Sequence, residues 1–236
     1  IDAIGALPTK AHMKILLQVL ASPKSADKMV SGEYVILGLA PAGGAYVFVN
    51  DRSINTLANA AGKRVAVLDY DPTQAEMVSQ IGATPVASDI VSAPNKFNNG
   101  VVDVLAAPLV AYEVLELYKG MDPDGGIIDY VLGQLTAQVI LKKDKFPADF
   151  AAQSRKYMLS QFDRAMRVIE NANNEVDKKW WIRIPEADKL RYDEMMREAR
   201  IALTNDGVYS KDMMSLLRKV RCKEEPSRAE CVNPVE

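Results

Sequence analysis

The sequence has few of the residues on which most catalytic and metal-binding sites depend. Its 236 residues include one histidine, His12, and two cysteines, Cys222 and Cys231. A metal site with several histidines is therefore excluded, and most histidine-based catalysis would depend on a single residue. Basic residues are not in excess, because 29 Lys and Arg stand against 31 Asp and Glu. A nucleic-acid binder needs a basic surplus to neutralise phosphates, so that class is excluded too.

Long apolar runs are also missing. No stretch approaches the ~20 apolar residues that span a bilayer, so an integral membrane protein is not expected. Hydrophobic residues nevertheless make up 48% of the chain, which is enough to build a core. The length corresponds to one large domain or two small ones, at about 100–200 residues per domain. The chain shows no signal peptide, but an exported mature chain would look the same.

Both cysteines lie near the C-terminus, in the segment RCKEEPSRAEC. Their spacing does not fit a zinc knuckle, which has two close pairs, or a redox C-x-x-C motif. Pro226 can turn the chain between them. We therefore favour a disulfide from Cys222 to Cys231 over two free surface thiols, and such a bond would indicate an exported protein.

Strands and helices alternate in the middle of the chain. The pattern predicts helices over residues 54–61, 73–81, 93–99 and 109–120, and strands over residues 63–71, 84–88 and 101–108. The strands are apolar, which is typical of a parallel sheet covered on both faces. In such sheets ligands bind beyond the carboxyl ends of the strands, where helices begin.

The flanking segments predict a second unit. Thr9 can cap a helix with Leu16 and Leu20 on its apolar face, and a short helix follows Pro23. Strands are expected over residues 33–39 and 45–49, separated at Pro41, Gly43 and Gly44 by a turn or a crossing point. A long β segment (127–142), one long amphipathic helix (147–176) and two terminal helices (184–203 and 211–220) complete the pattern.

We therefore predict two lobes joined by β crossings, which is the architecture of hinged ligand binders. The expected division of the chain is as follows: residues 1–49 form part of lobe I and the first hinge strand, 50–126 form lobe II, 127–146 return to lobe I, and 147–236 are helices that pack on lobe I and the hinge.

Three motifs between Tyr46 and Pro108 carry a family resemblance. They read FVNDRSINTLANAAGKRVAV, QIGATPVAS and KFNNGVVDVLAAP. This order resembles the solute-binding proteins of TRAP (tripartite ATP-independent periplasmic) transporters. The resemblance implies an α/β, two-lobed, type II periplasmic-binding-protein fold with mostly parallel sheets and long C-terminal helices. It also implies a periplasmic monomer, a small solute such as an organic or aromatic acid, TRAP membrane permease subunits as partners, and no cofactor.

Two departures from the family are visible. The family grips a ligand carboxylate with two arginines, whose positions fall here on Ala66 and about on Tyr46, with Arg64 nearby. A carboxylate ligand is therefore not the default. The opening strand–helix–strand of the family also has no counterpart here, so we expect lobe I to be partial.

Candidate ligand contacts lie where strands are predicted to end or to cross the hinge. Each has a structural alternative: Asp71 can cap the following helix, Tyr112 can be a core aromatic, and His12 fits a satisfied or surface position better than the cleft. Gln134 would be polar within an apolar stretch, which suggests a lining role. The candidate ligand-binding residues are Tyr46, Asp69, Tyr70, Asp71, Gln74, Pro108, Tyr112 and Gln134.

The functional prediction is a solute-binding protein without catalytic residues or a metal. We find no nucleophile elbow, metal-ligand set or reactive cysteine motif, and isolated aspartates do not form a catalytic constellation. The alternatives are an enzyme on a similar two-lobed fold and the effector-binding domain of a regulator. Turnover of a bound compound would indicate the enzyme, whereas free thiols would favour the regulator.

Overall fold

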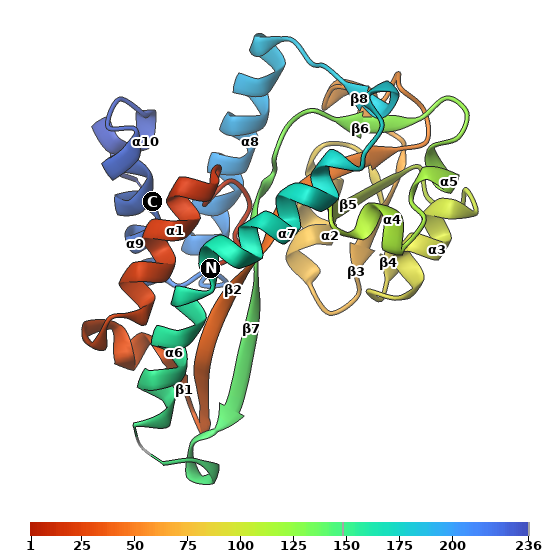
Figure 1. The fold of residues 1–236 in the computed structure, drawn as a ribbon. Helices are drawn as coiled ribbons and strands as arrows, with labels where there is room; N and C mark the ends of the chain where they lie inside the picture. The colour runs from red at the N-terminus through yellow and green to blue at the C-terminus, as the bar shows by residue number, and fades with distance from the viewer. Residues whose placement is uncertain (148, 236) are drawn as a thin grey trace.

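The structure is a computed structural model that describes residues 1–147 and 149–235. In this part of the chain, eight strands form one mixed sheet flanked by helices (Figure 1). The strands are β1 (Val30–Ser31), β2 (Tyr34–Val49), β3 (Arg64–Leu68), β4 (Thr84–Ser88), β5 (Val104–Pro108), β6 (Gly126–Ile128), β7 (Gly133–Lys142) and β8 (Trp181–Ile182). The α-helices are α1 (Lys10–Ala21), α2 (Pro72–Gln80), α3 (Ser92–Asn98), α4 (Ala111–Val114), α5 (Tyr118–Met121), α6 (Phe150–Ser160), α7 (Phe162–Asn174), α8 (Glu186–Asn205), α9 (Lys211–Glu224) and α10 (Ala229–Val232).

Strand β2 belongs to both lobes and connects them. Its first part pairs with β7, from Tyr34 opposite Lys142 to Ala45 opposite Gly133. Its last part pairs with β5 and β6 in lobe II. Of the two possibilities left open at Pro41–Gly44, the structure therefore shows a crossing and no turn. The register shifts between Pro41 and Gly43, and Gly43 adopts a φ of 97°, which a glycine tolerates best.

The α/β, two-lobed fold class is confirmed, with one correction to the sheet. Parallel pairs occur on either side of β2, between β3 and β4, β3 and β5, and β6 and β8. Strand β2 itself runs antiparallel to β1, β5, β6 and β7. The expectation of mostly parallel sheets was wrong for this strand, because β1 precedes it in a hairpin and β7 runs back along it in lobe I.

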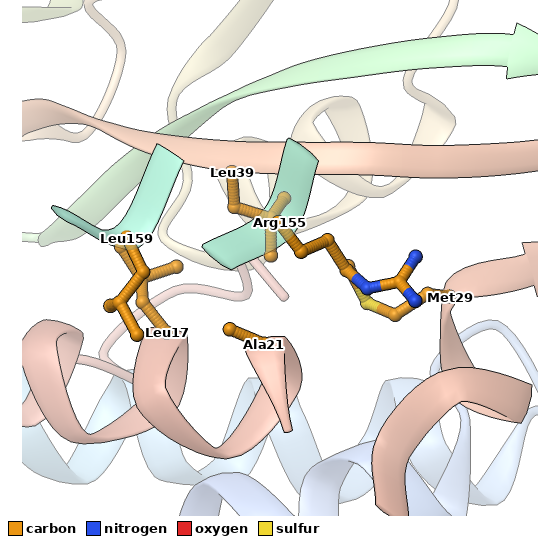
Figure 2. A pocket seen from close by; sticks show the side chains of 6 residues that line it. All are labelled: Leu17, Ala21, Met29, Leu39, Arg155 and Leu159. Carbon is orange, nitrogen blue, oxygen red and sulfur yellow. The ribbon is translucent and has the colours of Figure 1, made fainter. Parts of the chain in front are cut away.

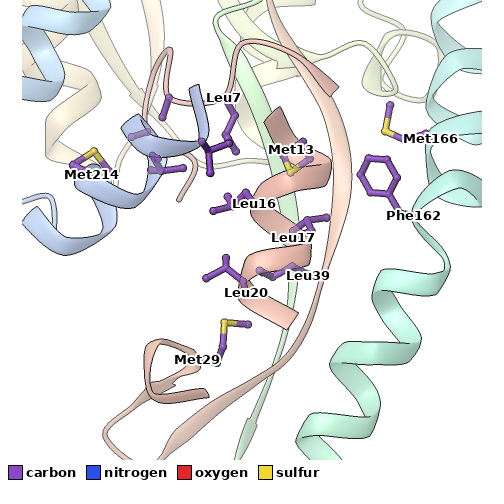
Figure 3. Packing of buried hydrophobic residues seen from close by; sticks show 14 of the residues in the cluster. Leu7, Met13, Leu16, Leu17, Leu20, Met29, Leu39, Phe162, Met166 and Met214 are labelled. Atoms are coloured by element: carbon purple, nitrogen blue, oxygen red, sulfur yellow. The ribbon is translucent and has the colours of Figure 1, made fainter. Parts of the chain in front are cut away.

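The core of lobe I packs α1 against α7, α9 and β2 (Figure 3). Helix α1 begins where its sequence indicates, with the Thr9 side chain accepting a hydrogen bond from the His12 amide. Leu16 and Leu217 are completely buried in this core. Burying side chains of this size stabilises a fold by about 1.5–3 kcal/mol each relative to leaving them exposed.

Lobe II has one apolar cluster on each face of its sheet. Phe48 packs with Phe97 of α3 and Trp180 in one cluster. Val49, the next residue of β2, packs in the other with Val78 of α2. This alternation is what a strand covered on both faces requires, and it places α2 and α3 on opposite faces.

Three predicted helices are shorter or broken. Only a 3₁₀ turn at Ala58–Ala60 forms within residues 54–61, because Asn59 and Thr56 use their side chains to bond nearby backbone groups. The predicted helix 109–120 divides into α4 and α5 at Glu116, whose φ is 51°. The long helix predicted from Pro147 becomes α6 and α7, separated at Gln161; its residue 148 lies outside the described residues.

The two tail cysteines form the expected disulfide. Cys222 of α9 and Cys231 of α10 are joined, with their Cα atoms 5.6 Å apart. The bond holds the short helix α10, which the sequence did not predict, against α9. Within the described residues, no helix combines the length and apolarity needed to cross a bilayer.

Candidate functional site

The parallel strands of lobe II end at the edge of the sheet that faces lobe I. Strand β3 ends at Leu68 and is followed by Asp69, Tyr70 and Asp71 before α2 begins. The amide of Asp69 donates to the Ser88 carbonyl at the end of β4, at 3.0 Å. This edge is where a sheet of this type binds ligands, as expected from the sequence.

Asp71 caps helix α2. Its Oδ1 accepts the Thr73 amide at 3.1 Å, and its Oδ2 accepts the Gln74 side-chain amide at 3.0 Å. The Gln74 Oε1 in turn accepts the Leu68 amide at 3.0 Å. These hydrogen bonds of Gln74 and Asp71 fix the turn between β3 and α2. Asp71 therefore has the helix-capping role that the sequence offered as its structural alternative.

Asp71 also lines a cavity between the two lobes. The cavity has a volume of about 320 Å³. That is at the small end of the range of about 300–1,000 Å³ for small-molecule sites. Lobe II contributes the start of α2, and lobe I contributes the N-terminal segment and the loop before α9. The lining residues are Ile1, Asp2, Ala3, Asp71, Thr73, Val208, Tyr209, Ser210, Met213 and Met214.

Tyr209 faces Asp71 and Thr73 of lobe II in this cavity. Tyr209 of lobe I and Thr73 of lobe II both line it, so each lobe contributes a hydroxyl-bearing side chain to its wall. Burial raises the pKa of the Tyr209 phenol, and the negative charge of Asp71 raises this pKa further. Tyr209 therefore remains protonated, so its O–H is available as a donor at neutral pH. Among the described residues that line the cavity, none is Lys, Arg or His.

Tyr46 and Gln134 lie on the other face of the sheet. Tyr46 packs in the cluster that contains Phe48, opposite the face that α2 covers. Its ring contacts Trp181 edge-on, with 5.5 Å between the centroids. Tyr46 and Gln134 both approach Gly44: a Cβ placed there would lie 3.2 Å from the Tyr46 ring and 3.4 Å from the Gln134 amide nitrogen. Burial, and secondarily the charge of Asp129, raises the pKa of Tyr46.

The remaining candidates have distinct environments. Pro108 is part of β5 and pairs with Ala45 of β2. Tyr112 is buried in the lobe II core beside Tyr118, 5.9 Å between ring centroids, so its position fits the core alternative. Tyr70 is 66% exposed. The structure thus brings Asp71 to the cavity with Thr73 and Tyr209, and places Tyr46 with Gln134 elsewhere.

Neither arginine position of the TRAP resemblance holds a cation. Ala66 is buried in lobe II. Arg64 lies at the opposite end of β3, where its Nη2 and Nε donate to Asp103 at 2.6 and 3.0 Å. This arginine holds the pKa of Asp103 at about 2.

His12 does not contribute to the cavity. Its ring is buried in lobe I, with Nδ1 2.7 Å from the Thr9 hydroxyl, and burial lowers its pKa. The sequence favours a surface or satisfied position, but only Nδ1 is satisfied, since the buried Nε2 has no hydrogen-bond partner among the described residues. No group of His, Cys, Asp and Glu side chains suited to a metal ion occurs among the described residues.

A second cavity lies inside lobe I, between α1 and α6 (Figure 2). Its volume is about 10 Å³, and the Arg155 side chain passes beside it toward Met29. The Arg155 Nη1 donates to the Ile36 carbonyl at 3.1 Å. A space of this size holds about one water molecule, so it is not a solute site.

Sequence reasoning missed most of the cavity wall in lobe I. Residues 1–3 and 208–214 form it, and neither segment shows a motif or an apolar period that marks a site. Ser210 could have been recognised locally, as the cap of α9. Its place opposite Asp71 depends on contacts between segments far apart in the sequence.

Comparison with known proteins gives a consistent assignment. The family model described as "Solute-binding protein AdeT 1/2" matches residues 1–236. The chain is 46% identical over 231 residues to "Probable solute-binding protein AdeT1" of Acinetobacter baumannii, which covers 98% of this chain and 76% of that protein.

Solved structures support the same fold. A TRAP periplasmic solute-binding protein from Rhodoferax ferrireducens with bound malonate superposes with a TM-score of 0.75 at 9% identity, covering 96% of this chain and 74% of that one. A TRAP solute-binding protein from Desulfovibrio salexigens with bound orotic acid gives 0.71 at 18% identity, covering 94% and 74%. These identities are low, so the two structures show the fold alone.

Proposed function

Because the chain belongs to the AdeT 1/2 family of solute-binding proteins, we propose that it captures a small polar molecule between its two lobes and delivers it to a membrane transporter of the TRAP type. The observation that carries the proposal is the cavity between Asp71 and Thr73 of lobe II and Tyr209 of lobe I. A solute that contacts both walls would stabilise the closed arrangement of the lobes more than an open one. Its affinity would come from this difference in stabilisation between the two arrangements.

We propose that the hinge between the lobes lies where β2 and β7 cross from one to the other. Strand β2 continues through both, so residues 50–126 can rotate against the rest by a small change near Gly43 and Gly44. The glycines lack side chains that would resist such a change. We propose that the lobes move in this way when the solute binds.

Within the cavity, we propose Asp71 and Tyr209 as the polar contacts to the solute. A carboxylate oxygen accepts and a phenol donates, so the two can orient one polar group. Asp69, Tyr70 and Gln74 lie around the same corner. Tyr46, Pro108, Tyr112 and Gln134 stay predictions from the sequence; none of them lines this cavity, so a solute held by them would occupy a different position.

The location and partners follow from the family and are proposed with it. The TRAP solute-binding fold and the Cys222–Cys231 bond both support an oxidising compartment, the periplasm. We propose that the protein acts as a monomer and meets TRAP permease subunits there. Organic and aromatic acids belong among the candidate solutes, since structural neighbours hold malonate and orotic acid, but a neutral or aromatic compound fits a lining with Asp2 and Asp71 and without Lys, Arg or His at least as well.

A thermal-shift screen of organic acids, aromatic acids, sugars and amino-acid derivatives tests the proposal. A solute at 100 times its dissociation constant should add about 2.7 kcal/mol, which is a shift of a few degrees. We expect a compound that raises Tm and is recovered unchanged by mass spectrometry. A compound that is bound and converted would instead indicate an enzyme, and a protein that binds no compound of these classes would contradict solute capture.

A further inference from the structure

The segment Ile1–Leu7 is held in place from three sides. We propose that Arg200 and Arg221 are positioning residues for the cavity, and that the disulfide-closed tail sets the position of Arg221. The cavity wall would then respond to the redox state of Cys222 and Cys231. The meaning of this arrangement for solute binding rests on the proposed function, but the contacts themselves can be tested without a solute.

Two buried arginines bind the backbone of this segment. Arg221 of α9 is completely buried, and its Nη1 donates to the Ala6 carbonyl at 3.0 Å. Arg200 of α8 is 2% exposed, and its Nη1 donates to the Ile4 carbonyl at 3.0 Å. A buried guanidinium that donates to a carbonyl fixes that backbone more firmly than a neutral donor does, because charge-assisted hydrogen bonds are the stronger ones.

Gly5, between these two carbonyls, shows how closely the arginines approach. Its φ is 65°, and a Cβ at this position would lie 2.6 Å from the Arg200 Nη1. The segment has therefore no room for a side chain between the arginine and the backbone. The carbonyls of Ile4 and Ala6 are presented to α8 and α9 by this turn.

The opposite side of the segment lies along the hinge strand. The Gly5 amide donates to the Leu132 carbonyl at 2.7 Å, and the Gln134 amide donates to the Leu7 carbonyl at 2.8 Å. The Asp2 carboxylate accepts the Thr136 hydroxyl at 2.8 Å. The segment thus bridges β7, where it begins at the hinge, and the buried arginines of lobe I, while Asp2 also faces the cavity.

The C-terminal tail, closed by the Cys222–Cys231 bond, holds the Arg221 side chain. Glu230 of α10 is 4% exposed, and its Oε1 accepts the Arg221 Nε at 2.9 Å and the Arg228 Nε at 2.8 Å. The Cys222–Cys231 bond encloses Arg228 and Glu230 in its loop and keeps α10 on α9. Without that bond, Glu230 would be free to leave with α10, and Arg221 would lose the carboxylate that orients it.

This chain of contacts runs from the disulfide to the cavity. Cys231 holds α10, Glu230 orients Arg221, and Arg221 holds the Ala6 carbonyl next to the segment that lines the cavity. Arg228 provides a matched comparison, because it binds the same Glu230 oxygen and also Glu225, but among the described residues it makes no hydrogen bond or ion pair with the N-terminal segment.

Amide hydrogen exchange of the whole protein tests the proposal. The variant Arg221→Lys keeps the charge but has a single donor group, so it cannot reach both Glu230 and the Ala6 carbonyl in the same way. We expect the amides of Gly5 and Gln134 to exchange at least tenfold faster in this variant. In Arg228→Lys, which keeps the Arg221 bond to the Ala6 carbonyl, their exchange should stay much closer to the wild-type rate.

Reduction of the wild-type protein gives a second measurement that needs no substitution. We expect reduced protein to show the same faster exchange at the Gly5 and Gln134 amides. The exchange rates of the β3 and β4 amides in lobe II should change less. An unchanged rate at Gly5 and Gln134 after reduction, or equal effects of Arg221→Lys and Arg228→Lys, would overturn the proposal. A uniform rise across both lobes would also overturn it, because it would show only a loss of global stability.

Discussion

Thr73 of α2 and Tyr209 in the loop before α9 line the same cavity from different lobes. They lie far apart in the sequence and belong to different apolar cores, because α2 packs on the lobe II sheet and Tyr209 packs against the core of lobe I. The distance between these two side chains reports how close the two lobes are to each other. Substitutions at this pair can therefore test lobe closure directly.

Replacement of Tyr209 by Phe should weaken binding of any solute that the cavity takes. The change removes the phenol donor from the cavity wall, and the hydrogen bond that this donor would give the solute is worth about 0.5–1.5 kcal/mol. We expect a roughly two- to tenfold rise in Kd by isothermal titration, with little change in Tm of the free protein. Tyr157→Phe is the control, since Tyr157 is 63% exposed on α6. Equal Kd values for the two variants would contradict a role for Tyr209.

The ion pair between Arg64 and Asp103 should make stability depend on acid pH. Hydrogen bonds from Arg64 hold the pKa of Asp103 at about 2, below its unfolded value of about 3.9. A depressed pKa contributes stability that is present above the unfolded pKa and is lost as pH falls toward about 2. Asp103→Asn should therefore cost about 1–3 kcal/mol at neutral pH and progressively less between pH ~4 and ~2.

Urea unfolding across that pH range measures this effect. The control is Glu76→Gln, which changes an exposed carboxylate on α2. It should shift the unfolding free energy by the same small amount at each pH. An Asp103→Asn penalty that stays constant down to pH ~2 would show that the ion pair does not set the acid dependence.

The tail disulfide should stabilise the folded protein by constraining the unfolded chain. The bonded cysteines are nine residues apart, and a loop of this length is worth about 2–3 kcal/mol in the chain-entropy account. The double variant Cys222→Ser, Cys231→Ser should lose about that much in urea unfolding. A thiol titration of the denatured, unreduced wild-type protein should find no free thiol, whereas two free thiols would rule out the bond.

Close packing of α6 on β2 requires glycine at position 38. A Cβ there would lie 2.4 Å from Cγ and 2.9 Å from Cβ of Met158. Gly38→Ala should therefore destabilise the protein by about 1–3 kcal/mol, the usual cost of overpacking. Gly133→Ala, in the paired strand β7, meets its nearest neighbour at 3.5 Å and should cost less. A larger loss of Tm for Gly133→Ala would contradict this packing.

Elements with strong local signals were predictable from the sequence. Helix α1 begins after Thr9 because a side chain close in sequence caps it, and β4 occupies residues 84–88 as predicted, after the turn at Gly82. The disulfide was predictable for the same reason, since its two cysteines are close together and a proline lies between them. In each case the deciding interaction involves neighbours along the chain.

Elements that depend on distant contacts were less predictable. The continuity of β2 through Pro41 and Gly43 comes from its pairing with β7 and β5, which local residue types do not reveal. Asp71 could be placed at the end of a strand from the sequence, but the opposite wall at Tyr209 could not. The cavity exists only because the loop before α9 and the N-terminal segment pack beside α2.

The measurement that tests the central claim most directly is a crystal structure of the protein with the solute that raises its Tm. The account predicts that the solute lies between the lobes, in contact with Asp71 and Tyr209, with both walls of the cavity closed on it. A solute bound on the opposite face of the sheet beside Tyr46 and Gln134, or on one lobe alone, would contradict the assignment of this cavity as the binding site.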